Sequence, residues 1–412
     1  MEVYYYISFK YIFVIYIYLY LLTNMKKISL FLICIIITLV SCIDVKKKLD
    51  NSVNLNKYEL IKTDTIKKIV LDEETKYNLN YLYLFKNDTI ECLSFLNYSF
   101  NQILFYNFKT CELLFKIDLE RDGPNGVGLA SGYYIKDFDN IYVSSYSYPG
   151  LLKIDIDGKI VQKINYGRTE DGYQIIPSYT PSSYPSIEPV FINNSVYLCQ
   201  NAVPHLNDIK ETPLTVSIDT LSGKSKSYPL KYDIFKPNKD KNKISSTLFS
   251  RVICDSSFIY SPFTDEHIYI TSINHSKIKK IKAGSNYIKD PSKEQTRIPQ
   301  IGAKENLELA RYGNLIYDKY RNVYYRFAYH KTTLEKKINW IGHAVYGRKK
   351  FSIIILNSDF QIIGETLFPE EIYNSYVAFV HKDGLYLSKD YQKNFEESED
   401  YATFELFKLK QL

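Results

Sequence analysis

Histidine is the first residue type to consider for chemistry, because imidazole binds transition metals and titrates near neutral pH. The six histidines of this chain are scattered, at His205, His267, His275, His330, His343 and His381. No two of them have metal-ligand spacing on one element, and even His267 and His275 would lie about 25 Å apart on an extended strand. We therefore predict no metal site and no cofactor.

Motifs for nucleophilic or phosphate chemistry are also missing. The sequence has no G-x-S-x-G elbow. The loop GPNGVG (123–128) could cradle an anion, but it lacks the Lys-Ser/Thr of a P-loop and precedes a β segment, so we interpret it as a turn. Oxygen-bearing side chains recur near the inner hairpin turns of the repeated units described below, at Asp155, Asp157, Asp219, Asn357 and Asp359. They could surround a calcium ion, but capping of turns is the favoured role. No catalytic residue is predicted.

Two loops rich in Tyr and Pro are the best candidates for ligand binding. They are SYSYPG (145–150) and YQIIPSYTPSSYPSIEPVF (173–191), and the candidate residues in them are Tyr146, Tyr148, Tyr173, Tyr179 and Tyr184. Tyr and Pro offer rigid amphipathic contacts of the kind that recognise carbohydrate or peptide. The alternative is that these tyrosines only pack within the fold.

One cysteine has a clear chemical role. Residues 25–42, MKKISLFLICIIITLVSC, consist of two lysines, an uncharged apolar run, a small residue and Cys42. This order is typical of a secretory signal, and the apolar run is short for a membrane span, which takes about 20 residues. LVSC (39–42) resembles the lipobox of bacterial lipoproteins, which predicts that residues 25–41 are a signal peptide and that Cys42 is lipidated.

The segments on either side of this signal need separate accounts. Residues 1–24 precede a complete signal, so we interpret them as an over-extended N-terminus. The alternative is that residues 3–41 form one or two membrane helices. Residues 42–57 are polar and lack periodicity, which predicts a tether between the lipid and a folded domain over 58–412.

Composition favours strands and argues against nucleic acid as a partner. The chain has 40 Tyr and 23 Phe, and branched and aromatic side chains suit pleated sheets. Its net charge of +6 is spread along the sequence without a dense basic stripe.

The same local pattern recurs six times. A short apolar strand is followed by a turn, a second strand, a turn rich in Asp, Asn or Gly, and a third strand. The clearest copy is DFDNIYVSSYSYPGLLKIDIDGKIVQKINYG (137–167), in which Leu152, Ile154 and Ile156 alternate with polar residues. The other copies cover residues 81–119, 193–230, 256–284, 322–368 and 383–412.

Six such units, none able to bury its apolar faces alone, predict an all-β, six-bladed β-propeller. We expect YELIKTDTIKKIVL (58–71) to supply the outer strand of the last blade, which would close the ring and remove exposed edges. Residues 304–313 have helical spacing and predict a helix between the fourth and fifth blades. Tandem β-sandwiches are the alternative architecture.

The segments DLERDGPNGVG (118–128) and YGNLIYDKYRNVYYRFAY (312–329), with the lipobox, the length and the spacing of the units, resemble a known family. It is the bacterial lipoproteins of domain-of-unknown-function family 4221, which are similar to six-bladed propellers with NHL and TolB-like repeats. The resemblance covers nearly the whole mature chain. It implies a propeller and a surface or periplasmic lipoprotein, and it carries over no activity.

Two functions follow as expectations for an outer membrane lipoprotein of a Gram-negative bacterium, on the periplasmic face or the cell surface. In the first, the membrane-anchored propeller is a binding or scaffold module for a peptide, a glycan or an envelope protein. In the second, it is a carbohydrate-active lyase or hydrolase with its site in the central channel. Converging carboxylates, His and Arg in that channel would favour the enzyme, whereas a channel plugged by Tyr and Ile, with an exposed aromatic rim, would favour binding.

Overall fold

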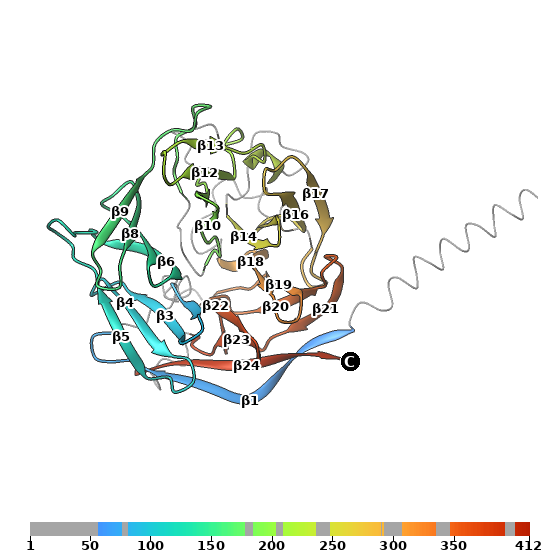
Figure 1. The fold of residues 1–412 in the computed structure, drawn as a ribbon. Helices are drawn as coiled ribbons and strands as arrows, with labels where there is room; N and C mark the ends of the chain where they lie inside the picture. Colours follow the sequence, from blue (N-terminus) through green and yellow to red (C-terminus); the bar gives the residue numbers. More distant parts are fainter. Residues whose placement is uncertain are drawn as a thin grey trace, which may run out of the picture. The chain divides into compact units, whose positions relative to one another are not determined.

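The structure is a computed structural model that describes residues 57–75, 81–177, 184–202, 209–235, 248–289, 291, 307–334, 347–391 and 400–412. Residues 56–412 form one compact unit, and residues 1–55, with Cys42, lie outside the described part. Six four-stranded antiparallel sheets are arranged in a ring (Figure 1). This confirms the predicted six-bladed β-propeller and excludes tandem β-sandwiches.

The first three blades, each given from its innermost to its outermost strand, follow one another along the chain. Blade 1 consists of β2 (Tyr83–Lys86), β3 (Glu91–Asn97), β4 (Gln102–Asn107) and β5 (Leu113–Asp118). Blade 2 consists of β6 (Ala130–Asp137), β7 (Asn140–Ser145), β8 (Gly150–Ile154) and β9 (Ile160–Asn165). Blade 3 consists of β10 (Val190–Ile192), β11 (Ser195–Cys199), β12 (Thr215–Asp219) and β13 (Ser225–Ser227), and the 3-10 helix η1 (Tyr232–Phe235) follows it.

The remaining blades complete the ring. Blade 4 consists of β14 (Phe249–Cys254), β15 (Ser257–Pro262), β16 (His267–Ser272) and β17 (Ile278–Lys282). Blade 5 consists of β18 (Arg311–Asp318), β19 (Val323–Tyr329), β20 (Phe351–Leu356) and β21 (Ile362–Leu367). Blade 6 consists of β22 (Asn374–His381), β23 (Gly384–Ser388), β24 (Tyr401–Gln411) and, from the other end of the sequence, β1 (Tyr58–Val70).

Strand β1 closes the ring, as the sequence predicts. It pairs antiparallel with β24 from Tyr58 opposite Gln411 to Val70 opposite Tyr401, with an irregularity between Lys62 and Ile66 (Figure 1). It also contacts blade 5, because the backbone N–H of Leu60 donates to Thr366 Oγ1 at 2.8 Å. The first and last strands of the fold therefore lie side by side, and β24, which would otherwise form the outer edge of blade 6, is paired on both sides.

A buried carboxylate supports this closure. Glu405 of β24 has a fully buried side chain and lies 2.9 Å from Lys62 Nζ of β1 and 3.2 Å from Lys389 Nζ. Tyr373 donates to it as well, at 2.5 Å. Burial opposes ionisation, but hydrogen bonds from Tyr373, Lys62 and Lys389 outweigh it and lower the pKa of Glu405 below 4.5.

We expect Glu405→Gln to lower the free energy of unfolding at pH 7 by about 1–2 kcal/mol, because a charge-assisted contact becomes a neutral one. A carboxylate with a lowered pKa contributes stability above its unfolded-state pKa, and that contribution disappears as the pH falls through the folded-state pKa. The wild-type protein should therefore lose more stability than the variant when the pH drops from 5 to 3. Chemical denaturation at the two pH values checks this, and equal losses would contradict it.

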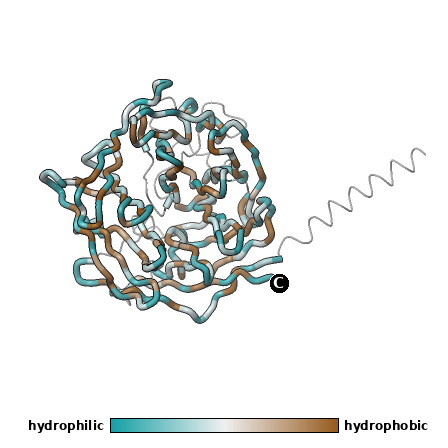
Figure 2. Tube along the Cα trace, viewed as in Figure 1, coloured by the Kyte–Doolittle hydropathy of each residue, from teal (hydrophilic) through white to brown (hydrophobic). Residues whose placement is uncertain are grey.

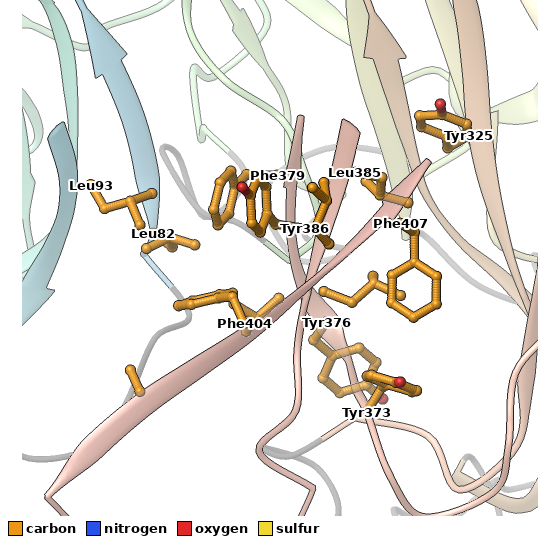
Figure 3. Close-up of a cluster of buried hydrophobic side chains, with 14 of the residues drawn as sticks. Leu82, Leu93, Tyr325, Tyr373, Tyr376, Phe379, Leu385, Tyr386, Phe404 and Phe407 are labelled. Atoms are coloured by element: carbon orange, nitrogen blue, oxygen red, sulfur yellow. The ribbon is translucent and has the colours of Figure 1, made fainter. Parts of the chain in front are cut away.

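Burial increases from the outer strands to the middle of each blade. Every residue of β19 and β20 is buried, whereas β17 is almost wholly exposed. Middle strands are buried because the neighbouring blade covers each of their faces, and hydrophobic segments recur around the ring in the hydropathy colouring (Figure 2). Aromatic rings fill the junctions between blades, and Figure 3 shows one such cluster, where Phe379, Tyr386, Phe404 and Phe407 of blade 6 meet Leu82 and Leu93.

The predicted repeats locate all six blades but begin late in five of them. The first predicted unit, 81–119, contains all of blade 1, whereas the second begins at residue 137, after β6 has started at Ala130. The innermost strands β6, β18 and β22 carry register shifts and polar residues, because one edge of each faces the channel instead of another strand. The predicted helix over 304–313 is wrong in its second half, since Arg311–Gly313 begin β18.

The two ends of the ring carry different kinds of connection. At one end, called the short-turn face here, tight turns join the first to the second and the third to the fourth strand of a blade. At the other end, called the long-loop face, lie the connections between blades and from second to third strands. The described parts of the longest of them are residues 166–177 and 184–189, 283–289 and 307–310, and 330–334 and 347–350. Long connections on a rigid scaffold are where binding residues usually lie.

Candidate functional site

The segment Tyr184–Glu188, part of the long connection between β9 and β10, enters the channel from the long-loop face. The Tyr184 ring stacks on Tyr376 of β22 at 3.8 Å between centroids and lies 5.6 Å from the ring of Phe263. Arg311 of β18 donates to its hydroxyl at 3.1 Å. Tyr184 is therefore held among residues of blades 4, 5 and 6.

The rest of this segment continues along the inner strands. The Ser186 N–H donates to Asn314 Oδ1 of β18 at 2.9 Å, and its carbonyl accepts from the Arg251 N–H of β14 at 2.9 Å. The Arg251 side chain donates to the Glu188 carbonyl at 2.8 Å. Together these contacts reach the innermost strands of blades 4, 5 and 6. The segment, with Tyr184 and the buried Ile187, therefore occupies the channel.

A pocket of about 410 Å³ lies at the short-turn end of the channel. It is lined by the ends of four innermost strands, β2, β6, β18 and β22, and by Ser186 and Glu188 of the channel segment. Within this lining Glu188 is the one carboxylate. Hydrolysis of a glycosidic bond ordinarily uses two carboxylates, so the described lining does not match that machinery.

The environment of Glu188 alters its acidity. Its side chain is exposed to the space of the pocket but surrounded by protein, and Tyr83 and Tyr134 lie close enough to feel its charge. Desolvation by this surrounding protein raises the pKa of Glu188 to about 7, and the charge of Arg251 opposes the rise only in part. Glu188 can therefore hold or release a proton near neutral pH.

The Glu188→Gln variant should show how much the ionisation of Glu188 contributes to the pH dependence of the protein's stability. A carboxyl group with a raised pKa binds its proton more tightly in the folded state, so ionisation removes stability as the pH rises from 4.5 to about 7. The wild type should lose stability over that range relative to the variant, by less than ~1.4 kcal/mol per pH unit because water in the pocket screens the charge. Unfolding at pH 5, 6, 7 and 8 measures this, and parallel profiles would contradict it.

An exposed aromatic platform, formed by Tyr98, Phe100 and Tyr146, lies on the long-loop face where blades 1 and 2 meet. Tyr146 is 64% exposed, and its ring lies edge-on to that of Tyr98, with centroids 6.4 Å apart. Phe100, in the same β3–β4 turn as Tyr98, is 47% exposed. Rings of this kind can stack on sugar or peptide groups.

Asn101 holds the platform in place. Its side-chain amide donates to the carbonyls of Leu119 at 2.7 Å and Gly128 at 2.9 Å, and its Oδ1 accepts from the Ala130 N–H at 2.9 Å. The turn that carries Tyr98 and Phe100 is thereby fixed to the connection between blades 1 and 2. A rigid platform loses little entropy when a ligand binds.

The structure does not gather the predicted tyrosines in one place. Tyr146 is exposed, but Tyr148 is half-buried and donates to Asn165. Tyr173 is also half-buried, with Lys231 Nζ 5.7 Å from its ring. Tyr184 is half-buried and packs inside the channel against Tyr376. Tyr179 and Cys42 lie outside the described residues.

The other chemistry candidates have structural roles where the structure describes them. Nε2 of His275 lies 2.6 Å from the Tyr260 hydroxyl, and burial lowers the pKa of this histidine to about 4, so it is neutral at pH 7. Asp155 and Asn357 accept backbone N–H groups within their hairpins, which confirms turn capping, but these hairpins are the outer ones of their blades and not the inner ones. No three His, Cys, Asp or Glu side chains in the described ranges could hold a metal ion together.

Tyr98, Phe100 and Glu188 are not among the functional residues predicted from the sequence. Tyr98 and Phe100 lie in a copy of the repeat that is rich in strands. In such a segment the local sequence does not distinguish an exposed aromatic ring from a buried one. Glu188 had a usable signal, since it is the one Asp, Glu, Lys or Arg between residues 172 and 207. A single charged residue in an otherwise uncharged segment is a reason to consider that residue as a candidate for function.

Comparison with known proteins identifies the family. A family model described as "Domain of unknown function (DUF4221)" matches residues 57–367. The chain belongs to the DUF4221 family. Among the curated proteins nothing matches.

Two solved structures resemble this DUF4221 protein. A DUF4221 family member from Bacteroides vulgatus is 27% identical, with a TM-score of 0.75, and the match covers 87% of this chain and 100% of that one. A putative exported protein from Bacteroides fragilis is 11% identical, with a TM-score of 0.49, and the match covers 87% of this chain and 97% of that one. In the part of the DUF4221 protein that the structure describes, no helix is long and apolar enough to cross a membrane.

Proposed function

We propose that this protein is a lipid-anchored binding module of the bacterial envelope, which holds a glycan or an extended peptide on its long-loop face. The aromatic platform of Tyr98, Phe100 and Tyr146 carries this proposal. It combines large exposed rings with a turn fixed by Asn101. Exposed aromatic side chains on fixed loops are a common means of recognising sugars and peptides.

The segment that fills part of the channel favours binding over catalysis. The segment Tyr184–Glu188 occupies the position in which the enzyme hypothesis would place its site, and it brings Tyr184 and Ile187 into the channel. One carboxylate lines the described pocket, whereas a hydrolase would ordinarily need two. Glu188, with its pKa near 7, is the residue on which the enzymatic alternative depends.

Anchoring rests on Cys42, which lies outside the described residues. The signal-like stretch over 25–41 and the polar residues 42–57 would place the propeller close to the outer membrane, on the periplasmic face or the cell surface. Labelling cells with an alkyne-bearing fatty acid tests this. Wild-type protein should be labelled and the Cys42→Ala variant should not, and labelling of both would contradict the proposal.

The Tyr146→Ala variant tests the platform. The intact protein, in detergent, is applied to arrays of envelope glycans and of peptides. We expect loss of the ring to weaken any saturable binding at least tenfold, as for other central aromatic contacts. Tyr401→Ala is a matched control, since Tyr401 is an exposed tyrosine of blade 6. Equal binding by Tyr146→Ala and the wild type would contradict a role for the platform.

A further inference from the structure

The pocket at the short-turn end of the channel has features of a small-molecule site, on the face opposite the aromatic platform. Its volume of about 410 Å³ lies in the range of ligand pockets, which is roughly 300–1,000 Å³. The lining combines apolar side chains, including Ile316, Ala378 and Val380, with a few polar groups. Such a combination binds the body of a small molecule and also fixes its orientation.

Negative charge lies on the channel segment that forms the inner part of the pocket. Glu188 accepts no side-chain hydrogen bond from any residue that the structure describes, although its own backbone carbonyl is bound by Arg251. The aromatic residues Tyr83 and Tyr134, on β2 and β6, adjoin it. A carboxylate surrounded by protein and left without a donor gains most from a ligand that brings a positive charge.

Positive charge lies at the other end of the pocket. Lys86 ends β2, Lys136 is next to last in β6, and Lys319 follows β18, and all three residues contribute to the lining. These strands run in the same direction, so their ends meet at the short-turn face. Lys86 pairs with Glu91 at 3.1 Å, whereas Lys136 and Lys319 form no ion pair with any described carboxylate.

We propose that this pocket binds a small zwitterion of amino-acid or dipeptide size, with its ammonium group at Glu188 and its carboxylate at the lysines. The apolar wall between the two ends would take an aliphatic side chain. In this arrangement the carboxylate of Glu188 faces the ligand's positive charge and the lysines face its negative charge. Binding involves no covalent step. This inference does not depend on the proposed glycan or peptide site on the long-loop face.

Binding of such a ligand should release protons from Glu188, which can be measured. The pKa of Glu188, about 7, means that roughly half of the free protein carries a proton there at pH 7. The charged groups that face it are Arg251 of β14 and, as polar neighbours, Tyr83 and Tyr134. A bound ammonium would favour the ionised carboxylate, so binding should release up to about half a proton per ligand.

The test uses the full chain in detergent with leucine, N-acetylleucine and leucinamide as probes, measured by thermal shift and by calorimetry in two buffers at pH 7. We expect leucine to raise the melting temperature and to release protons, and each capped compound to bind at least tenfold more weakly. Glu188→Gln should weaken leucine binding at least tenfold, and Glu120→Gln, a change at an exposed carboxylate on the other face, should leave it unchanged.

Lys319→Met provides a second variant at an exposed residue outside the strands. It should weaken leucine binding severalfold and leave the weaker binding of leucinamide unchanged, because leucinamide has no carboxylate. Absence of a thermal shift with leucine would overturn the proposal. The proposal would also be overturned if the Glu188→Gln variant bound leucine as tightly as the wild type does. Equal affinity of the wild type for leucine and for both capped compounds would overturn it as well.

Discussion

Replacing Arg326 with methionine is expected to lower the free energy of unfolding by about 3–5 kcal/mol. Arg326 of β19 is fully buried, and its guanidinium carbon lies 3.8 Å from the centroid of the Tyr312 ring. Nε donates to Ser261 Oγ of blade 4 at 3.0 Å. The remaining donors reach backbone carbonyls of the same region, at Pro262, Asp265, Glu266, His267 and Ala283.

The guanidinium group therefore joins blade 4 to blade 5. Burial lowers the pKa of Arg326 to about 10, which still leaves it cationic at neutral pH. Methionine fills much of the same volume but donates nothing, so several carbonyls would lose a partner in a dry interior. Chemical denaturation measures the loss. The matched control is Arg168→Met, an exposed arginine that should change stability by less than about 0.5 kcal/mol, and equal effects of the two substitutions would contradict this account.

Removing strand β1 should prevent formation of a stable ring. Leu60 and Ile69 are 3% and 0% exposed, and their burial alone is worth roughly 1.5–3 kcal/mol each. Deletion would also leave β24 as a long unpaired edge, which promotes aggregation. Domains of this kind are stabilised by only about 5–15 kcal/mol in total, so the loss removes much of the available stability.

The comparison requires two truncated chains that both lack residues 1–55. A chain that starts at residue 56 retains β1 and should unfold cooperatively. A chain that starts at residue 71 lacks it and should show no cooperative transition, or should form aggregates. Calorimetry and size-exclusion chromatography distinguish the two chains. If both gave the same melting temperature, β1 would have no role in closure.

The strands could be predicted from sequence because their physical cause is local. In β8, Leu152 and Ile154 alternate with Lys153, which is the period of a strand, although Leu151 on the opposite side is buried as well, and the structure ends β8 at Ile154. The role of residues 58–71 was also predictable, since a ring of blades needs a partner for its last edge. The innermost strands were harder to predict from the sequence. One edge of each faces the channel instead of another strand, so their side chains do not follow a regular apolar pattern.

The functional surfaces could be predicted only in part. The loop over 173–191 stood out in the sequence because it is rich in tyrosine, but its tyrosines were considered and its one acidic residue was not. Whether Tyr184 is exposed depends on Tyr376 and Arg311, which are distant in sequence. Tyr98 and Tyr146 meet because two blades pack together, and no local pattern records that contact.

The central claim is that this propeller binds its ligand without transforming it. The most direct measurement incubates the intact protein with a panel of envelope glycans and follows binding and product formation in the same samples. We predict saturable binding that is weakened by Tyr146→Ala, with every glycan recovered unchanged. Turnover of a glycan that disappears in Glu188→Gln would contradict the account and would make the channel pocket an active site.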